Sequence, residues 1–222
     1  MSIRTVGRGH GLLFSQMEPQ PGSEAEFHDW YEHEHIPARL QLRGFSAARR
    51  YVARSGTPRF LAVYELSQLD ALESAQYQQL KRNPSARTAR MLSTANGFTR
   101  FVCEEVSDTG PRAPAPWLSV VAFSVPGDDE PIFNWWYEQE HVPLLMGSAL
   151  WWRVRRYRVT DGEGGPWTHL ALHELASEAA MDAPERDMAR QTPLRGKLAS
   201  KPWFAASGRW LYELISNSLE VT

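Results

Sequence analysis

One motif occurs twice in the chain, and no other feature limits the fold as strongly. Residues 30–37 read Trp-Tyr-Glu-His-Glu-His-Ile-Pro, and residues 136–143 read Trp-Tyr-Glu-Gln-Glu-His-Val-Pro, an offset of 106 (136 − 30). Residues 169–175 match residues 60–66 at an offset of 109 (175 − 66). Such a series of matches indicates an internal duplication.

Each half of the chain reads as the same succession of strands and helices. Apolar runs bounded by Gly and Pro predict the strands, and amphipathic stretches predict the helices. In the first half we expect strands at 11–17, 45–53, 60–66 and 98–106, and helices beginning at Ser23, Ser67 and Pro84. Pro37 disfavours helix at Ile36, so the first helix is expected to end close to His35.

Residues 108–116 contain three prolines and a glycine and predict an extended linker. The linker divides the chain into a first ferredoxin-like repeat at 1–107 and a second at 117–222. In such a βαββαβ repeat, helices cover one face of a four-stranded antiparallel sheet. Packing of the two bare sheet faces would complete the fold. The predicted class is therefore α+β, with tandem ferredoxin-like repeats forming a pseudo-dimeric α+β barrel.

The composition argues against several classes of function. The 222-residue chain has a net charge of −2, which does not favour binding to nucleic acid or to a membrane surface. Its single cysteine, Cys103, cannot form an internal disulfide and reads as a small buried hydrophobe. The sequence has no apolar run long enough for a membrane span and no phosphate-binding loop, nucleophile elbow or zinc cysteine pattern. We expect a soluble cytoplasmic protein.

The repeated motif resembles that of a known family. An aromatic residue, Tyr, three residues and His-Ile/Val-Pro precede Arg-Arg-Tyr at 49–51 and at 155–157. This pattern is similar to the EthD-like branch of the dimeric α+β barrel superfamily. Over nearly the whole chain, the resemblance implies two ferredoxin-like copies fused in one chain, an intramolecular pseudo-dimer; a homodimer stays open. The second copy departs from the first at Leu150, which replaces Gly44, and in a longer hairpin at 160–166.

The duplicated histidines are the leading candidates for catalysis. The resemblance implies that His35 and His141 lie near a cleft between sheet and helices, where an imidazole can give and take protons near neutral pH. Either His could instead only bond a local carbonyl at the helix end. Four further catalytic candidates are Glu32 and Glu138, three positions before each His, and Tyr51 and Tyr157 on the second strands. The glutamates could fix the imidazole tautomer or belong to a solvated acidic face.

Aromatic and polar side chains are the candidates for substrate binding. They are Trp30, Tyr31, Trp136, Tyr137, Tyr64, His169 and His173. His169 and His173 alternate with Leu170 and Leu172, which suit a helix-covered core. We therefore expect the two histidines to face the barrel interior, where they could equally be hydrogen-bonded core residues.

Anion binding by arginine and metal binding are weaker hypotheses than acid/base chemistry by the histidines. The basic residues are nearly all Arg, which fits anion recognition or a bias of codon composition. Each Arg pair, at 49–50 and 155–156, places one guanidinium inward, towards an anionic ligand or an internal carboxylate. His28, Glu32 and His35 share a helix face, but the second copy has Asn134 in place of His28. We predict no metal site.

Three functions follow as hypotheses. The first is an enzyme without an organic cofactor, which uses His-centred acid/base chemistry on an aromatic or polyketide-like carbonyl compound, as a lyase, cyclase or isomerase. The second is a non-catalytic small-ligand-binding or stress-response α+β barrel protein. The third is a haem-dependent oxygenase or peroxidase. The expected partner is a small hydrophobic or aromatic ligand, with no nucleic acid and no membrane.

Overall fold

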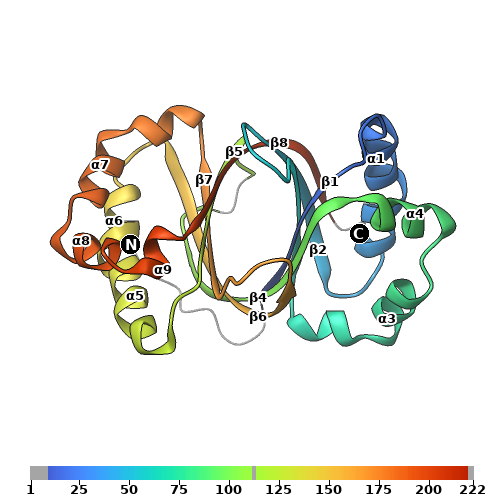
Figure 1. The fold of residues 1–222 in the computed structure, drawn as a ribbon, viewed down its shortest axis with the longest axis horizontal. Helices are drawn as coiled ribbons and strands as arrows, with labels where there is room; N and C mark the ends of the chain where they lie inside the picture. Colours follow the sequence, from blue (N-terminus) through green and yellow to red (C-terminus); the bar gives the residue numbers. More distant parts are fainter. Residues whose placement is uncertain (1–9, 112–113, 220–222) are drawn as a thin grey trace. The chain divides into compact units, whose positions relative to one another are not determined.

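The chain divides into two compact units (Figure 1). The computed structural model describes residues 10–111 and 114–219. Among these, the N-terminal unit comprises 10–104, 160–165 and 215–219, and the C-terminal unit comprises 105–159 and 166–214. The division falls inside a strand, before the predicted linker, whose residues Arg112 and Ala113 lie outside the described residues. The N-terminal unit thus takes in two short segments of the second half, and the C-terminal unit takes in residues 105–107 of the first.

The N-terminal unit has the βαββαβ order. Its elements are β1 (Gly11–Glu18), α1 (Glu24–Trp30), a π-helical turn (Tyr31–His35), α2 (Ile36–Leu40), β2 (Phe45–Ala53), β3 (Phe60–Leu66), a 3₁₀ turn (Leu69–Glu73), α3 (Ala75–Arg82), α4 (Ala86–Thr94) and β4 (Asn96–Thr109). β1 lies between β3 and β4, and β2 pairs with β3, all antiparallel. The helices cover one face of this sheet.

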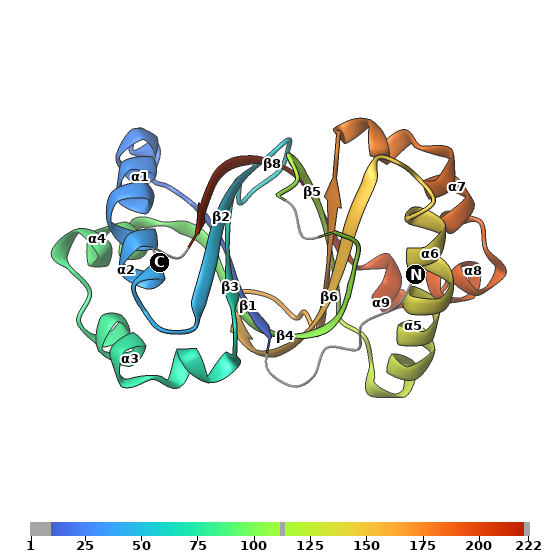
Figure 2. The same ribbon diagram turned by 180° about the vertical axis from the view of Figure 1, so that it is seen from behind.

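The C-terminal unit repeats the plan. Its elements are β5 (Trp117–Phe123), a 3₁₀ turn (Gly127–Asp129), α5 (Glu130–Trp136), a π-helical turn (Tyr137–His141), α6 (Val142–Leu145), β6 (Trp151–Glu163), β7 (His169–Leu175), a 3₁₀ turn (Glu178–Asp182), α7 (Pro184–Arg190), α8 (Pro193–Ala199), α9 (Pro202–Ala205) and β8 (Gly208–Leu219). β5 lies between β7 and β8, and β6 pairs with β7, again antiparallel. Figure 2 shows the helices of each unit on one side of its strands.

The predicted fold class is confirmed. The strands follow one another in the closed order β1-β3-β2-β8-β5-β7-β6-β4, which is a barrel topology. β4, β6 and β8 are the long strands, of 14, 13 and 12 residues, and each runs from one unit into the other. Their length, which a single four-stranded repeat does not need, is what produces the exchange of strand ends.

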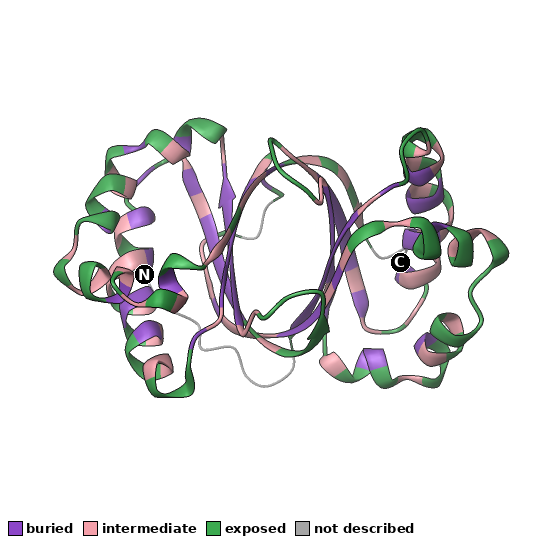
Figure 3. Cartoon of the chain, viewed as in Figure 1, coloured by how far each residue is buried: buried purple, intermediate pink, exposed green. Residues whose placement is uncertain are grey.

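Each unit has its own core between helices and sheet. In the N-terminal unit, Phe27 and Trp30 of the helix pack against Phe60 and Tyr64 of β3. In the C-terminal unit, the core contains Phe133 and Trp136 of α5 and Phe123 of β5, with many further buried side chains. Figure 3 shows the buried residues concentrated on the strands and on parts of the helices, with exposed residues at the loops and outer turns.

The first helix does not end at His35 as predicted. It continues as α2 to Leu40, because the π-helical turn accommodates the proline. Inside an α-helix, Pro37 would leave the carbonyl four residues back unbonded and would collide with it. The Ile36 N–H instead bonds the Tyr31 carbonyl, five residues back, so the turn widens at this point. The second copy does the same between Val142 and Tyr137.

The predicted orientation of β7 was wrong. His173 points to the helices, where it contacts Tyr137 and Trp151, and Ala171 lies in the helix-covered core. Leu170 and Leu172 point to the opposite sheet face, and there they are 2% and 0% exposed. Both faces of the strand are buried, so apolar character could not tell one face from the other.

Candidate functional site

Each unit holds a cavity between its helices and its sheet. The N-terminal cavity has a volume of about 290 Å³, and the C-terminal cavity about 240 Å³. Pockets for drug-sized ligands span roughly 300–1,000 Å³, so both cavities suit a small molecule. His35 lines the first and His141 the second. The duplicated histidines therefore occupy corresponding places in two cavity walls.

The π-helical turns place the aromatic and imidazole side chains of each wall. In the N-terminal unit, the His35 ring lies 4.2 Å from the Trp30 ring and 5.1 Å from the Tyr31 ring, centre to centre. In the C-terminal unit, the corresponding distances from His141 to Trp136 and Tyr137 are 4.5 and 5.1 Å. The two copies thus hold the imidazole against the same pair of rings.

Burial keeps these imidazoles neutral. His35 is only 6% exposed, and burial, helped by Arg39 and Arg50, holds its pKa well below 6.5. Burial lowers the pKa of His141 to about 3, although the Ala189 backbone opposes the shift. The Nδ1 atom of His35 has no hydrogen-bond partner among the described residues. At neutral pH each imidazole can accept a proton.

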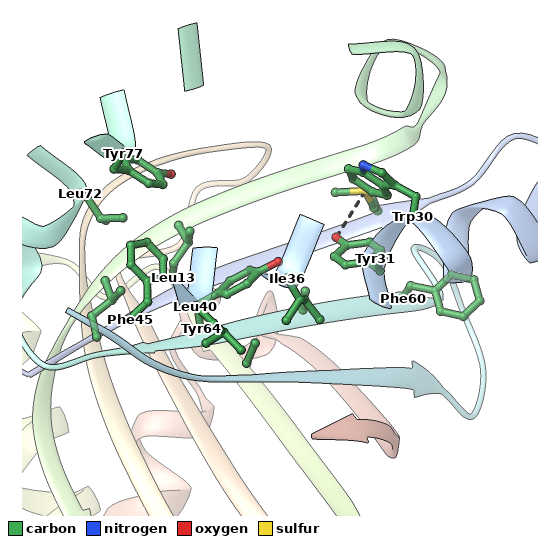
Figure 4. Packing of buried hydrophobic residues seen from close by; sticks show 14 of the residues in the cluster. Leu13, Trp30, Tyr31, Ile36, Leu40, Phe45, Phe60, Tyr64, Leu72 and Tyr77 are labelled. Atoms are coloured by element: carbon green, nitrogen blue, oxygen red, sulfur yellow. Dashed lines mark hydrogen bonds between the residues drawn. The ribbon is translucent and has the colours of Figure 1, made fainter. Parts of the chain in front are cut away.

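The Tyr64 hydroxyl is a second unpaired polar group in the N-terminal wall. Its ring centre lies 6.5 Å from that of His35, and its oxygen is buried without a hydrogen-bond partner in the described part of the chain. Burial raises the Tyr64 pKa, so the phenol stays protonated. Figure 4 shows Tyr64 among buried apolar side chains that include Leu13 and Ile36, and the Tyr31 hydroxyl directed instead at the Met17 sulfur at 3.6 Å. An unpaired buried hydroxyl costs about 1–3 kcal/mol unless a ligand or water bonds it.

Cationic side chains surround this pair. Arg39 lies over the Tyr64 ring, 5.6 Å from its centre, and donates to the His35 carbonyl at 3.0 Å. Lys81 and Arg100 also line the cavity, and Glu163 adds a carboxylate. The N-terminal cavity therefore combines a neutral base, a hydroxyl donor and a partly balanced positive charge.

In the C-terminal cavity, a hydrogen-bonded chain replaces the free hydroxyl. The Trp151 indole N–H donates to Nδ1 of His173 at 3.2 Å. An indole nitrogen can only donate, so the neutral His173 must carry its proton on Nε2. That nitrogen lies 3.3 Å from the Tyr137 hydroxyl oxygen and donates to it. The Tyr137 proton is then free for another acceptor, and burial raises the Tyr137 pKa to about 12.

Glu32 and Glu138 do not orient the histidines. Glu32 accepts from Arg50 at 2.8 Å and from Ser216 at 3.0 Å, while Arg50 lies 4.3 Å above the Tyr31 ring. In the second copy Glu138 pairs with Arg156, which lies 4.5 Å above the Tyr137 ring. Each glutamate forms the stronger charge-assisted bond to Arg in place of the expected contact with the neighbouring His. The glutamates hold a guanidinium on the tyrosine face.

The same arginine network accounts for the other predicted features. His28 contacts Arg50 at 3.0 Å, so His28, Glu32 and His35 do not converge as metal ligands. In residues 10–111 and 114–219, no cluster of three His, Cys, Asp or Glu side chains suits a metal ion. The other member of each Arg pair forms an internal salt bridge, Arg49 with Glu65 and Arg155 with Glu174.

The structure does not bring all the predicted site residues to the cavities. Tyr51 and Tyr157 are buried on the sheet face opposite the helices, since each alternates with an Arg that contacts the helix. His169 lies beside Glu130, 3.3 Å away, and is not part of the cavity wall. Trp30 is fully buried and bonds Thr88 at 2.9 Å. Tyr31, Tyr64, Trp136, Tyr137 and His173 do line the cavities.

The sequence did not identify several residues of the cavity walls. Arg39, Lys81 and Arg100 line the N-terminal cavity; Trp151, Arg186, Arg190, Arg195 and Arg209 line the C-terminal one. The arginine bias was visible, but the late helices of each repeat showed no motif that would single out particular arginines.

Comparisons with known proteins give structural neighbours for the fold. No family model matches the chain, and no curated protein matches it. Among solved structures, an anthrone oxidase-like protein superposes with a TM-score of 0.69 at 10% identity, covering 100% of this chain and 98% of that one. A putative monooxygenase from Fusobacterium nucleatum gives 0.63 at 6% identity, covering 97% and 96%. A putative chlorite dismutase gives 0.59 at 12% identity, covering 95% and 96%.

The chain therefore shares the ferredoxin-like α+β barrel architecture with proteins that carry diverse enzyme names. In the part of the chain that the structure describes, none of the helices is long and apolar enough to traverse a lipid bilayer.

Proposed function

We propose that the N-terminal cavity is the active site of a small-molecule enzyme that moves a proton on an aromatic or polyketide-like carbonyl compound. The observation that carries the proposal is the neutral, buried His35 imidazole in the cavity wall, next to the unpaired Tyr64 hydroxyl. The chemistry is that of an isomerase, cyclase or lyase and uses no organic cofactor. Affiliation with the EthD-like branch belongs to the same proposal.

The proposed step is removal of a proton from the carbon beside a carbonyl group. The C–H bond breaks, its proton goes to the His35 imidazole, and its electron pair moves through the carbon–carbon bond to the carbonyl oxygen. Tyr64 donates a hydrogen bond to that oxygen as negative charge develops. Arg39, which lies against the Tyr64 ring, stabilises the enolate electrostatically. Return of the proton to another carbon completes an isomerisation.

A probe with an acidic methylene group tests this step. Anthrone is suitable because it is an aromatic ketone and because a structural neighbour carries the name anthrone oxidase-like. We expect the protein to accelerate exchange of the methylene hydrogens for deuterium, followed by NMR. His35→Gln should reduce that exchange about 100-fold or more, the usual range for loss of a general base.

His33→Gln is the matched control, because His33 lies two positions away with a side chain that is 74% exposed. It should leave exchange unchanged. A folded His35→Gln protein with full exchange, or a wild type that gives none, would contradict the proposal. Circular dichroism checks folding, and Tyr64→Phe provides a second variant that should slow exchange.

Two other hypotheses lead to different outcomes in the same assay. A non-catalytic ligand-binding protein would bind anthrone without exchanging its hydrogens. A haem-dependent enzyme would need a cavity for a macrocycle, whereas cavities of about 290 and 240 Å³ suit smaller ligands. Addition of haemin with a visible absorbance scan tests that hypothesis directly.

A further inference from the structure

Four arginines gather around the C-terminal cavity. Arg186 and Arg190 come from α7, Arg195 from α8 and Arg209 from β8. No aspartate or glutamate contributes to the cavity wall within the described residues. The positive charge faces the cavity from three separate elements, so it does not arise from the sequence of one exposed helix.

Asp182 and Asp187 offset part of the positive charge of Arg186. In residues 10–111 and 114–219, no carboxylate forms an ion pair with any of the four guanidinium groups. Arg186 donates to the Met181 carbonyl at 2.6 Å, and Arg195 and Arg209 lie 5.4 and 6.0 Å from the Phe204 ring centre. Burial first, and then the neighbouring arginines, lower the pKa values of Arg186, Arg195 and Arg209. Gathered positive charge of this kind is stabilised by an anion.

The N-terminal cavity shows that the fold itself does not require this charge. At the offset of 109, Arg186 and Arg195 correspond to Tyr77 and Ala86, and Arg190 to Lys81. Only Arg209 has an arginine, Arg100, as its counterpart. The N-terminal cavity also includes Glu163, for which the C-terminal wall has no equivalent. The C-terminal wall thus has arginines at two positions where the first copy has uncharged residues, and it has Leu145 where the first copy has Arg39 at the motif offset of 106.

A polar donor and flat rings complete the site. The Trp151–His173–Tyr137 chain leaves the Tyr137 hydroxyl proton free for a ligand acceptor. Trp151 and His173 stand where the first copy has Phe45 and Tyr64, so this series of hydrogen bonds belongs to the second copy alone. Trp136 and Phe204 line the cavity and offer apolar ring surface. Guanidinium groups bind carboxylates in a forked geometry, and aromatic walls favour a planar ligand.

We propose that the C-terminal cavity is a second binding site, specific for a small aromatic carboxylate. The carboxylate is held by the arginines of α7, α8 and β8 and by the Tyr137 hydroxyl, and the ring lies against the aromatic wall. This site does not depend on the reaction proposed for the N-terminal cavity.

Calorimetric titration with 2-naphthoate and 2-naphthamide tests the site. The two probes share a ring and differ in charge, so the wild type should bind the acid at least tenfold more tightly. The double variant Arg195→Gln/Arg209→Gln should lose roughly 10- to 100-fold in affinity for the acid and change little for the amide. Arg82→Gln, an exposed arginine of α3 in the other unit, is the control and should bind normally.

A second readout separates binding from a structural role. Because the arginines repel one another, the double variant should melt at the same temperature as the wild type or higher without ligand, and should lose the rise that 2-naphthoate gives the wild type. Tyr137→Phe should also weaken the acid more than the amide.

Equal affinity for the acid and the amide would overturn the proposal. So would a folded double variant that retains full affinity for 2-naphthoate. If inorganic phosphate bound as tightly as 2-naphthoate, the assignment to an aromatic carboxylate would be wrong.

Discussion

Two histidines at equivalent positions of a duplicated motif have different electrostatic surroundings. His35 lies beside Tyr64 in a cavity that includes a carboxylate, whereas His141 lies 6.3 Å from His173 in a cavity lined by arginines. A nearby positive charge disfavours protonation of an imidazole. Arg39 and Arg50 also lower the pKa of His35, so both imidazoles stay neutral, and the wall of the second cavity is the more strongly cationic of the two.

The burial of His141 makes stability depend on pH. Its folded pKa of about 3 lies below the ordinary 6.5, so the unfolded chain takes up the proton first as the pH falls. The contribution of neutral His141 to the free energy of unfolding is fully present above about pH 6.5 and is lost as the pH falls towards 3. Between pH 7.5 and 5 the wild type should lose about 2 kcal/mol more unfolding free energy than His141→Gln. Urea titrations at both pH values measure this; His33→Gln should follow the wild type, and parallel losses in wild type and His141→Gln would contradict the prediction.

The unpaired Tyr64 hydroxyl gives a stability prediction of the opposite kind. Removing a buried hydroxyl that lacks a partner relieves its desolvation cost, so Tyr64→Phe should stabilise the ligand-free protein by about 1 kcal/mol. Tyr77→Phe is the control, since the Tyr77 oxygen accepts from Arg100 at 3.4 Å and its loss should bring no gain. Chemical denaturation compares the two. Destabilisation by Tyr64→Phe would indicate that the hydroxyl is paired in solution.

At the scale of single residues, the sequence predicted the histidines but not their partners. His35 and His141 stood out because the motif repeats. The sequence did not show that Glu32 and Glu138 bind arginines rather than the histidines. Arg50 and Arg156 lie on strands, 18 positions further along the chain. Sequence spacing alone favours neighbours on one helix, and a buried guanidinium on another element forms the stronger bond.

At the scale of elements, the strands and helices were largely predictable, but the wide turn at each motif was not. Pro37 correctly marked an irregularity, and the expected outcome was a helix end. The chain instead inserts one residue into the turn and continues as helix. Such insertions often occur at functional sites. Here the insertion places Tyr31 and His35 in one cavity wall.

The turn can be tested at Pro37. Pro37→Ala permits an ordinary α-helical turn, which would rotate Tyr31 and His35 relative to the sheet. Because alanine is favoured in helix interiors, the variant should keep or raise its melting temperature while anthrone exchange falls at least tenfold. Pro193→Ala, at the first turn of α8 where proline is well tolerated, should change neither property. Normal exchange in Pro37→Ala would show that the turn does not depend on the proline.

At the scale of the molecule, the duplication predicted the architecture, and the exchange of strand ends is the feature that it could not show. The linker prediction placed the boundary at 108–116, but the compact N-terminal unit also takes in residues 160–165 and 215–219. Contacts of these segments include the Ser216–Glu32 bond and the Thr160 hydroxyl bond to the Val102 carbonyl at 3.1 Å. A repeat in sequence is not by itself an independent folding unit.

Separate fragments test this dependence. Fragments 1–111 and 114–222 should each fail to melt cooperatively, since each lacks strand ends that complete its unit. Mixing them should restore cooperative melting, followed by circular dichroism. Cooperative melting of 1–111 alone, at the temperature of the intact chain, would show that the exchanged segments are dispensable.

The shared strands also affect how this protein can change over generations. After a gene duplication, one copy can usually lose its function when the other copy supplies it. Here the loss of either half would remove strand ends from the other, so both must be kept as scaffold even when only one retains the ancestral chemistry. Selection then holds the backbone of the second copy and leaves its cavity free to acquire another ligand. Tandem barrels of this kind should accumulate unlike pairs of sites.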